Sequence, residues 1–114
     1  PPPPSRHMIR ALGEEARPAV EKVMSAQEAA FRAAGEAHRA ANKAYRAALT
    51  AKPFDSQNLT DALAARRQTK AQMRQLMDNA FVEIVAEVGP GARNKLAEMR
   101  RRGRPKRDRE HRRD

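Results

Sequence analysis

Histidine and methionine side chains are the residues in this sequence whose chemistry suits a transition-metal ion. Met73 and Met77 are four residues apart, so a helix would place both thioethers on one face. Thioethers suit soft ions such as Cu(I), and imidazoles suit Ni, Co, Zn and Cu. His38 lies among apolar residues at helical spacing, and His7 stands near the N-terminus. We therefore take a divalent transition metal as the candidate cofactor and His7, His38, Met73 and Met77 as its candidate ligands.

The same side chains also have interpretations without a metal. A single histidine on an apolar face forms a hydrogen bond to a neighbouring helix, or changes the charge of an interface near neutral pH. Methionines fill gaps in cores and form adaptable binding surfaces. We therefore also predict a surface for a partner or an unfolded client on one helix. Its residues are Arg66, Arg67, Lys70, Met73, Met77 and Phe81.

The C-terminal residues carry a second candidate site. Residues 100–114 hold nine Lys or Arg and three acids, so most of the net charge of +10 lies there. Within them, the run Arg102, Gly103, Arg104, Pro105, Lys106, Arg107 resembles the AT-hook, which places arginines in the narrow minor groove of A·T-rich DNA. The alternative is a solvated polycation that keeps the protein in solution or contacts anionic lipid.

Enzymatic chemistry has little support in the sequence. It lacks the order of Ser, His and Asp of a hydrolytic triad, a glycine loop for phosphates, and carboxylates clustered at helical spacing. The chain has no cysteine, which excludes disulfides, thiolate metal sites and thiol catalysis. We expect a binding protein and not an enzyme.

The spacing of apolar residues predicts two long helices. Over residues 14–50 a seam repeats in alternating steps of three and four, and its members are Val20, Met24, Gln27, Phe31, Ala34, His38, Ala41, Tyr45 and Ala48. Pro53 ends this helix and Asp55 is suited to cap the next one, over residues 56–87. So short a connection makes the two helices antiparallel.

Shorter elements flank these two helices. Residues 91–101 form a third helix after the break at Gly89, and Gly13 separates a short helical turn from the first long helix. We predict an all-α fold, a long antiparallel helical hairpin with short flanking helices. Residues 1–6 are a proline-rich linker, residues 7–102 the hairpin domain and residues 103–114 a disordered basic tail. A fold this thin buries more surface by dimerising.

This layout resembles the periplasmic heavy-metal-resistance family, which includes membrane-anchored metal sensors and small helical chaperones. The resemblance rests on the turn Ala51-Lys52-Pro53-Phe54-Asp55, the arginine-rich second helix, and degenerate copies of a repeated element at Leu12–Arg17 and Val88–Arg93. It implies a hooked helical hairpin that forms a homodimer in the periplasm. The implied partners are a membrane signalling protein or unfolded clients.

The sequence departs from the pattern of this family in one respect. The sensors of the family use histidine pairs spaced four residues apart, whereas His7, His38 and His111 are scattered. The chain begins with proline, so we expect an upstream signal or membrane anchor. Two alternatives stay open, a DNA-associated helical protein that uses residues 102–107 and a purely structural coiled-coil module. Under the periplasmic hypothesis, nucleic acid is not an expected partner.

Overall fold

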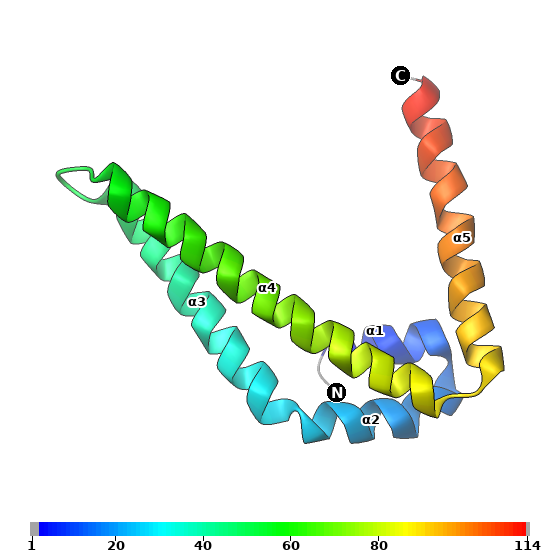
Figure 1. Ribbon diagram of the computed structural model, residues 1–114. Coiled ribbons are helices and arrows are strands. Elements are labelled where there is room, and N and C mark those ends of the chain that lie inside the picture. Colours follow the sequence, from blue (N-terminus) through cyan, green and yellow to red (C-terminus); the bar gives the residue numbers. More distant parts are fainter. Residues whose placement is uncertain (1–2, 114) are drawn as a thin grey trace. The chain divides into compact units, whose positions relative to one another are not determined.

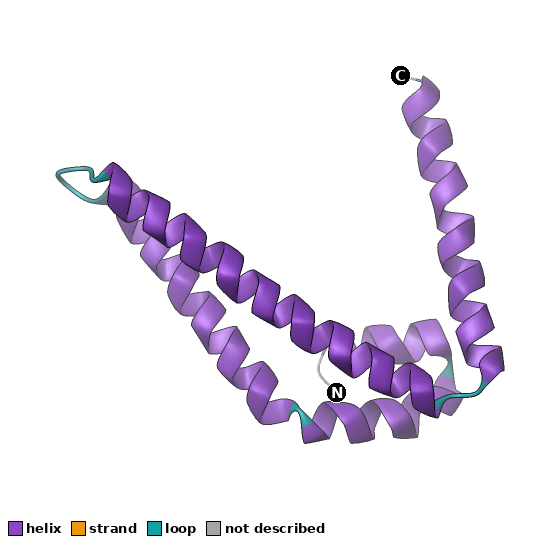
Figure 2. Cartoon of the chain, viewed as in Figure 1, coloured by secondary structure: helices purple, strands orange, loops and turns teal. Residues whose placement is uncertain are grey.

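The computed structural model describes the backbone of residues 3–113 and the side chains of residues 5–101. All regular structure in the described residues is helical, as predicted (Figure 2). The helices are α1 (Pro3–Leu12), a 3-10 turn η1 (Glu14–Ala16), α2 (Arg17–Ala26), α3 (Glu28–Thr50), α4 (Ser56–Glu87) and α5 (Pro90–Arg113).

The chain divides into two compact units. Pro1–Ser25 and Val82–Asp114 form the first, which we call the flanking unit. Ala26–Phe81 form the second, which we call the hairpin unit because it holds α3 and most of α4. α4 has residues in both units, whereas α1 and α5 lie in the flanking unit alone.

The flanking unit holds the large buried side chains. Leu12, Val20 and Ile84 are the largest fully buried ones, at 2%, 0% and 0% exposure. In α1 the buried positions follow the spacing of one helical face, which is why this segment folds as an amphipathic helix against α5. These positions are Ser5, Met8, Ile9 and Leu12. The helix therefore begins at Pro3, inside the segment predicted as a linker.

Gly13 ends α1 in a conformation that favours glycine. Its φ is 98°, and its N–H donates to the Ile9 carbonyl over 2.7 Å, which closes the last turn of α1. Directly afterwards Arg17 binds Glu14 through two hydrogen bonds of 2.8 and 2.9 Å, and this contact lowers the pKa of Glu14 from its ordinary value. A Cβ at Gly13 would lie 3.9 Å from Lys95 Nζ, so the break after α1 lies beside α5.

The second predicted break, at Gly89 between α4 and α5, is stabilised by Arg93. Arg93 Nη1 donates to the carbonyls of Val85 and Val88 over 3.3 and 3.4 Å, which satisfies carbonyls at the C-terminal end of α4. Pro90 then starts α5, at the position where a helix tolerates proline best. Lys22 of α2 pairs with Glu87 of α4 over 3.0 Å in the same unit.

The expected continuous helix over residues 14–50 is interrupted. α2 ends at Ala26, and Gln27 has φ −106° and ψ 10° before α3 begins at Glu28. No proline or glycine stands there, and the interruption falls next to the boundary between the two units. Val20, Val23 and Met24 are buried in the flanking unit, while α3 packs in the hairpin unit.

α5 is assigned from Pro90 to Arg113, and the side chains beyond residue 101 lie outside the described part of the chain, so the disordered tail stays a prediction. Phe54, in the turn between α3 and α4, is 57% exposed.

A pair of valines tests the location of the core. We expect Val20→Ala to lower the free energy of unfolding by about 2 kcal/mol, because it removes buried methyl groups and leaves a cavity. Val82→Ala makes the same chemical change at a helical position that is 66% exposed, so its effect should stay within about 0.5 kcal/mol. Urea unfolding followed by far-UV circular dichroism measures both. Equal losses would contradict this assignment of the core.

Candidate functional site

Within the hairpin unit, α3 and α4 lie side by side and run in opposite directions (Figure 1). Asp55 caps α4 as predicted, since its Oδ1 accepts hydrogen bonds from the N–H groups of Gln57 and Asn58 over 3.0 and 3.3 Å. The cross-helix contacts pair Gly35 with Met73, His38 with Thr69, and Asn42 with Arg66. The partner number falls as the α3 number rises, which fixes an antiparallel register.

The buried apolar side chains of the hairpin unit are all small. The buried hydrophobic residues of the hairpin unit are Ala41, Ala48, Ala62 and Ala80. Small side chains let two helix backbones approach closely, but each buries little apolar area. The larger apolar side chains of the unit's seam are therefore only half-buried. They are Phe31, Tyr45, Leu59, Leu63, Met73, Leu76, Met77 and Phe81.

Polar side chains connect the two helices at the middle of the hairpin, and we call this group the polar layer (His38, Asn42, Tyr45, Arg66 and Thr69). Arg66 Nε donates to Asn42 Oδ1 over 2.8 Å, and its guanidinium carbon lies 4.3 Å from the centroid of the Tyr45 ring. His38 Nδ1 lies 2.8 Å from Thr69 Oγ1. All five side chains are half-buried.

The Thr69 hydroxyl lies between His38 and the Arg66 carbonyl, and the tautomer of His38 decides which side donates in the His38–Thr69 bond. Thr69 Oγ1 lies 3.1 Å from the Arg66 carbonyl, and a hydroxyl that gives its one hydrogen to that carbonyl acts toward His38 as an acceptor. We therefore expect His38 Nδ1 to be the donor and the lone pair of the neutral ring to be on Nε2. A histidine that ligates a metal has the same arrangement, with its other N–H held by a protein oxygen.

The candidate metal ligands fall in both units. His7 lies exposed on α1 in the flanking unit, whereas His38, Met73 and Met77 lie half-buried in the hairpin unit. Among the described residues there is no group of three or more His, Cys, Asp or Glu side chains that could hold a metal ion. A site formed by these histidines and methionines stays a prediction.

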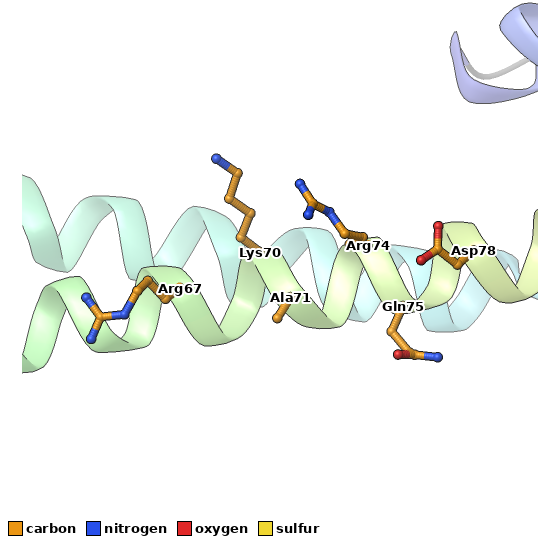
Figure 3. Close-up of a pocket in the computed structure, with 6 residues that line it drawn as sticks. All are labelled: Arg67, Lys70, Ala71, Arg74, Gln75 and Asp78. Carbon is orange, nitrogen blue, oxygen red and sulfur yellow. The ribbon is translucent and has the colours of Figure 1, made fainter. Parts of the chain in front are cut away.

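The predicted client surface divides between two faces of α4. Arg66, Met73, Met77 and Phe81 are half-buried, while Arg67 and Lys70 are exposed on the outer side. The two exposed cations line a shallow depression formed by α4 alone (Figure 3). Its residues are Arg67, Lys70, Ala71, Arg74, Gln75 and Asp78.

Sequence reasoning missed three members of the polar layer, Asn42, Tyr45 and Thr69, as partners of Arg66 and His38. The position of the turn could have identified these three residues, because it sets which residues of the two helices lie opposite each other. The AT-hook-like run at residues 102–107 lies outside the residues whose side chains the structure describes. No helix in the described part of the chain is long and apolar enough to span a membrane.

Comparisons with known proteins give one match. A family model described as heavy-metal resistance matches residues 1–95, which is most of the chain. Comparisons with curated proteins and with solved structures found no match.

The tautomer of His38 is testable by NMR of the imidazole nitrogens. We expect His38 in the Nδ1–H form, and Thr69→Val should return it to the ordinary mixture of tautomers and lower stability by about 1 kcal/mol. Thr60→Val is the matched control, because Thr60 makes only the bond to the Ser56 carbonyl within its own helix. An unchanged His38 spectrum in Thr69→Val would contradict this hydrogen bond.

A titration tests the metal ligands. Isothermal calorimetry of the full chain measures its affinity for nickel, cobalt, copper and zinc. We expect His38→Ala to leave any micromolar affinity unchanged, because one imidazole without further ligands holds these ions weakly. Met73→Leu with Met77→Leu removes the thioethers and keeps the apolar volume, so it serves as the second variant. Micromolar binding that either variant abolishes would establish a metal site.

Proposed function

Because the chain belongs to the heavy-metal resistance family, we propose that it contributes to heavy-metal resistance by binding polypeptide chains through its hairpin unit. The family is not known for enzymatic activity, and binding without catalysis agrees with the absence of catalytic motifs in the sequence. The bound chain is an unfolded client, a signalling partner or a second copy of the protein.

One observation carries this proposal, the alanine-only core of the hairpin unit. The two helices bury Ala41, Ala48, Ala62 and Ala80, and the larger apolar side chains of the seam are only half-buried. Burial of apolar area stabilises by about 25 cal/mol per Å², so a further helix or an extended apolar segment gains free energy by covering these side chains. Flexible methionines let such a surface adapt to different sequences.

A homodimer is the form of this protein that we propose. A second copy brings a second alanine-rich hairpin with the same half-buried side chains, and two such surfaces are complementary in a symmetric dimer. The dimer and a client would then compete for the same apolar surface.

The periplasm is the location that we propose. The family is typically extracytoplasmic, which supports it. An anchor upstream of residue 1 would keep the hairpin near a membrane signalling partner. In this proposal a metal acts on the partner, on the client or between copies of the chain, because the described residues hold no group of three or more His, Cys, Asp or Glu.

Client binding is testable with reduced insulin. Dithiothreitol makes insulin aggregate and cannot alter a chain without cysteine. We expect the wild-type protein to suppress light scattering, and Met73→Ala with Met77→Ala to need about tenfold more protein, because about 1 to 2 kcal/mol of apolar contact is lost. Circular dichroism checks that the variant keeps its helices.

Two controls make this experiment specific. Val82→Ala with Met99→Ala removes comparable apolar area at positions that are 66% and 49% exposed in the flanking unit, and should leave the activity unchanged. Met73→Leu with Met77→Leu keeps the apolar area and should also retain it. Equal activity of the alanine variant and the wild type would refute client binding by the hairpin unit.

A further inference from the structure

Six exposed cations of the hairpin unit follow a single rule of position. Each comes directly after a residue that contacts the opposite helix. Arg39, Lys43 and Arg46 follow His38, Asn42 and Tyr45 on α3, and Arg67, Lys70 and Arg74 follow Arg66, Thr69 and Met73 on α4. All six are exposed, and none forms an ion pair or hydrogen bond with another described residue.

This rule brings both rows of cations to the same side of the hairpin. One residue corresponds to a rotation of about 100° around a helix, so each row lies about 100° from the seam in the same rotational sense. Because α3 and α4 are antiparallel and face each other through the seam, rotations of the same sense point to one common face. We call it the cationic face. Figure 3 shows Lys70 and Arg74 projecting to the same side of α4.

The opposite side of the hairpin is neutral. The residues that come directly before the same positions carry no charge. They are Ala37, Ala44, Ala65, Gln68 and Gln72, together with Ala41, which is buried in the seam itself. In addition, no Asp or Glu occurs in residues 37–54 or 62–77. The cationic face is thus not balanced by acids on its own helices, and its charge lies on one side.

We propose that the cationic face binds the surface of an anionic lipid bilayer, with α3 and α4 lying flat on the headgroups. The register places Arg74 near residue 34 of α3, so the two rows extend over about 12 residues, or about 18 Å. Two packed helices lie about 8–10 Å apart, which makes the array planar. A planar layer of phosphates contacts all six cations at once.

Other polyanions fit this face less well. A specific protein interface has apolar anchors in its centre. The exposed large apolar residues of the described chain are Leu49, Phe54, Val82 and Met99, and none lies within residues 37–46 or 65–74. Single-stranded nucleic acid needs exposed aromatic rings for stacking, and the phosphates of a duplex curve away from a flat array.

Vesicle binding tests the proposal in the full chain. The probe is large vesicles of phosphatidylcholine with 30 mol% phosphatidylglycerol, measured by co-sedimentation at low salt. Arg67→Gln, Lys70→Gln and Arg74→Gln together should weaken partitioning about 100-fold, the loss expected for three cations near an anionic surface. High salt should weaken the wild type similarly, because the contacts are exposed.

A matched control has the same net charge. Ala37→Glu, Gln68→Glu and Gln72→Glu also lower the charge by three, but at exposed positions of the neutral side. This variant should lose much less affinity. Equal losses in the two triple variants would show that net charge alone binds the vesicles, and would overturn the cationic face as a site.

Site-specific labels separate this face from the basic C-terminal residues, which attract anionic vesicles in every variant. Because the chain has no cysteine, Lys70→Cys or Ala44→Cys gives one attachment point for an environment-sensitive fluorophore. The label at position 70, which projects to the same side of α4 as Arg74 in Figure 3, should change its emission on vesicles, and the label at position 44 should not. If neither label responds while the protein is bound, the proposal fails.

The last experiment measures binding to a different polyanion, a DNA duplex. A 20-base-pair DNA duplex should bind the wild type and the triple glutamine variant with similar affinity, because in this proposal the face contacts a flat surface. If the variant loses affinity for the duplex and keeps its affinity for the vesicles, the face belongs to nucleic acid and the lipid assignment is wrong.

Discussion

The close pairing of α3 and α4 through alanine is the contact on which the hairpin unit depends. Alanine lets the two backbones approach, yet four buried methyl groups contribute little hydrophobic free energy to an isolated helix pair. Large buried side chains such as Leu12 and Ile84 belong to the flanking unit. The flanking unit thus buries its large apolar side chains fully, whereas the hairpin unit buries its large apolar side chains only in part. Partly buried apolar side chains are expected in a binding element.

The polar layer gives this thin hairpin a defined register. Alanines at helical spacing would fit equally well after a shift by one turn, because one methyl group resembles the next. A shift would separate Arg66 from Asn42 and His38 from Thr69, and would leave half-buried polar groups without partners. Hydrogen bonds in the middle of the pair therefore select one alignment, as a buried polar residue does in a coiled coil.

The sequence predicted those parts of the fold that depend on local pattern. The seam spacing identified the inward positions of α3, and Asp55 marked the start of α4. The interruption at Gln27 was not predictable, because no breaker residue stands there and it falls next to the boundary between the two units. Likewise Arg66 was predicted as part of a partner or client surface, but its contacts with Asn42 and Tyr45 required the register of the opposite helix.

Thr69 connects the two cross-helix contacts of the polar layer. Its hydroxyl lies 2.8 Å from His38 Nδ1 on α3 and 3.1 Å from the carbonyl of Arg66, whose side chain reaches Asn42. The contacts at residues 38 and 42 are therefore joined through one turn of α4, and a rotation of α4 about its axis would break both together.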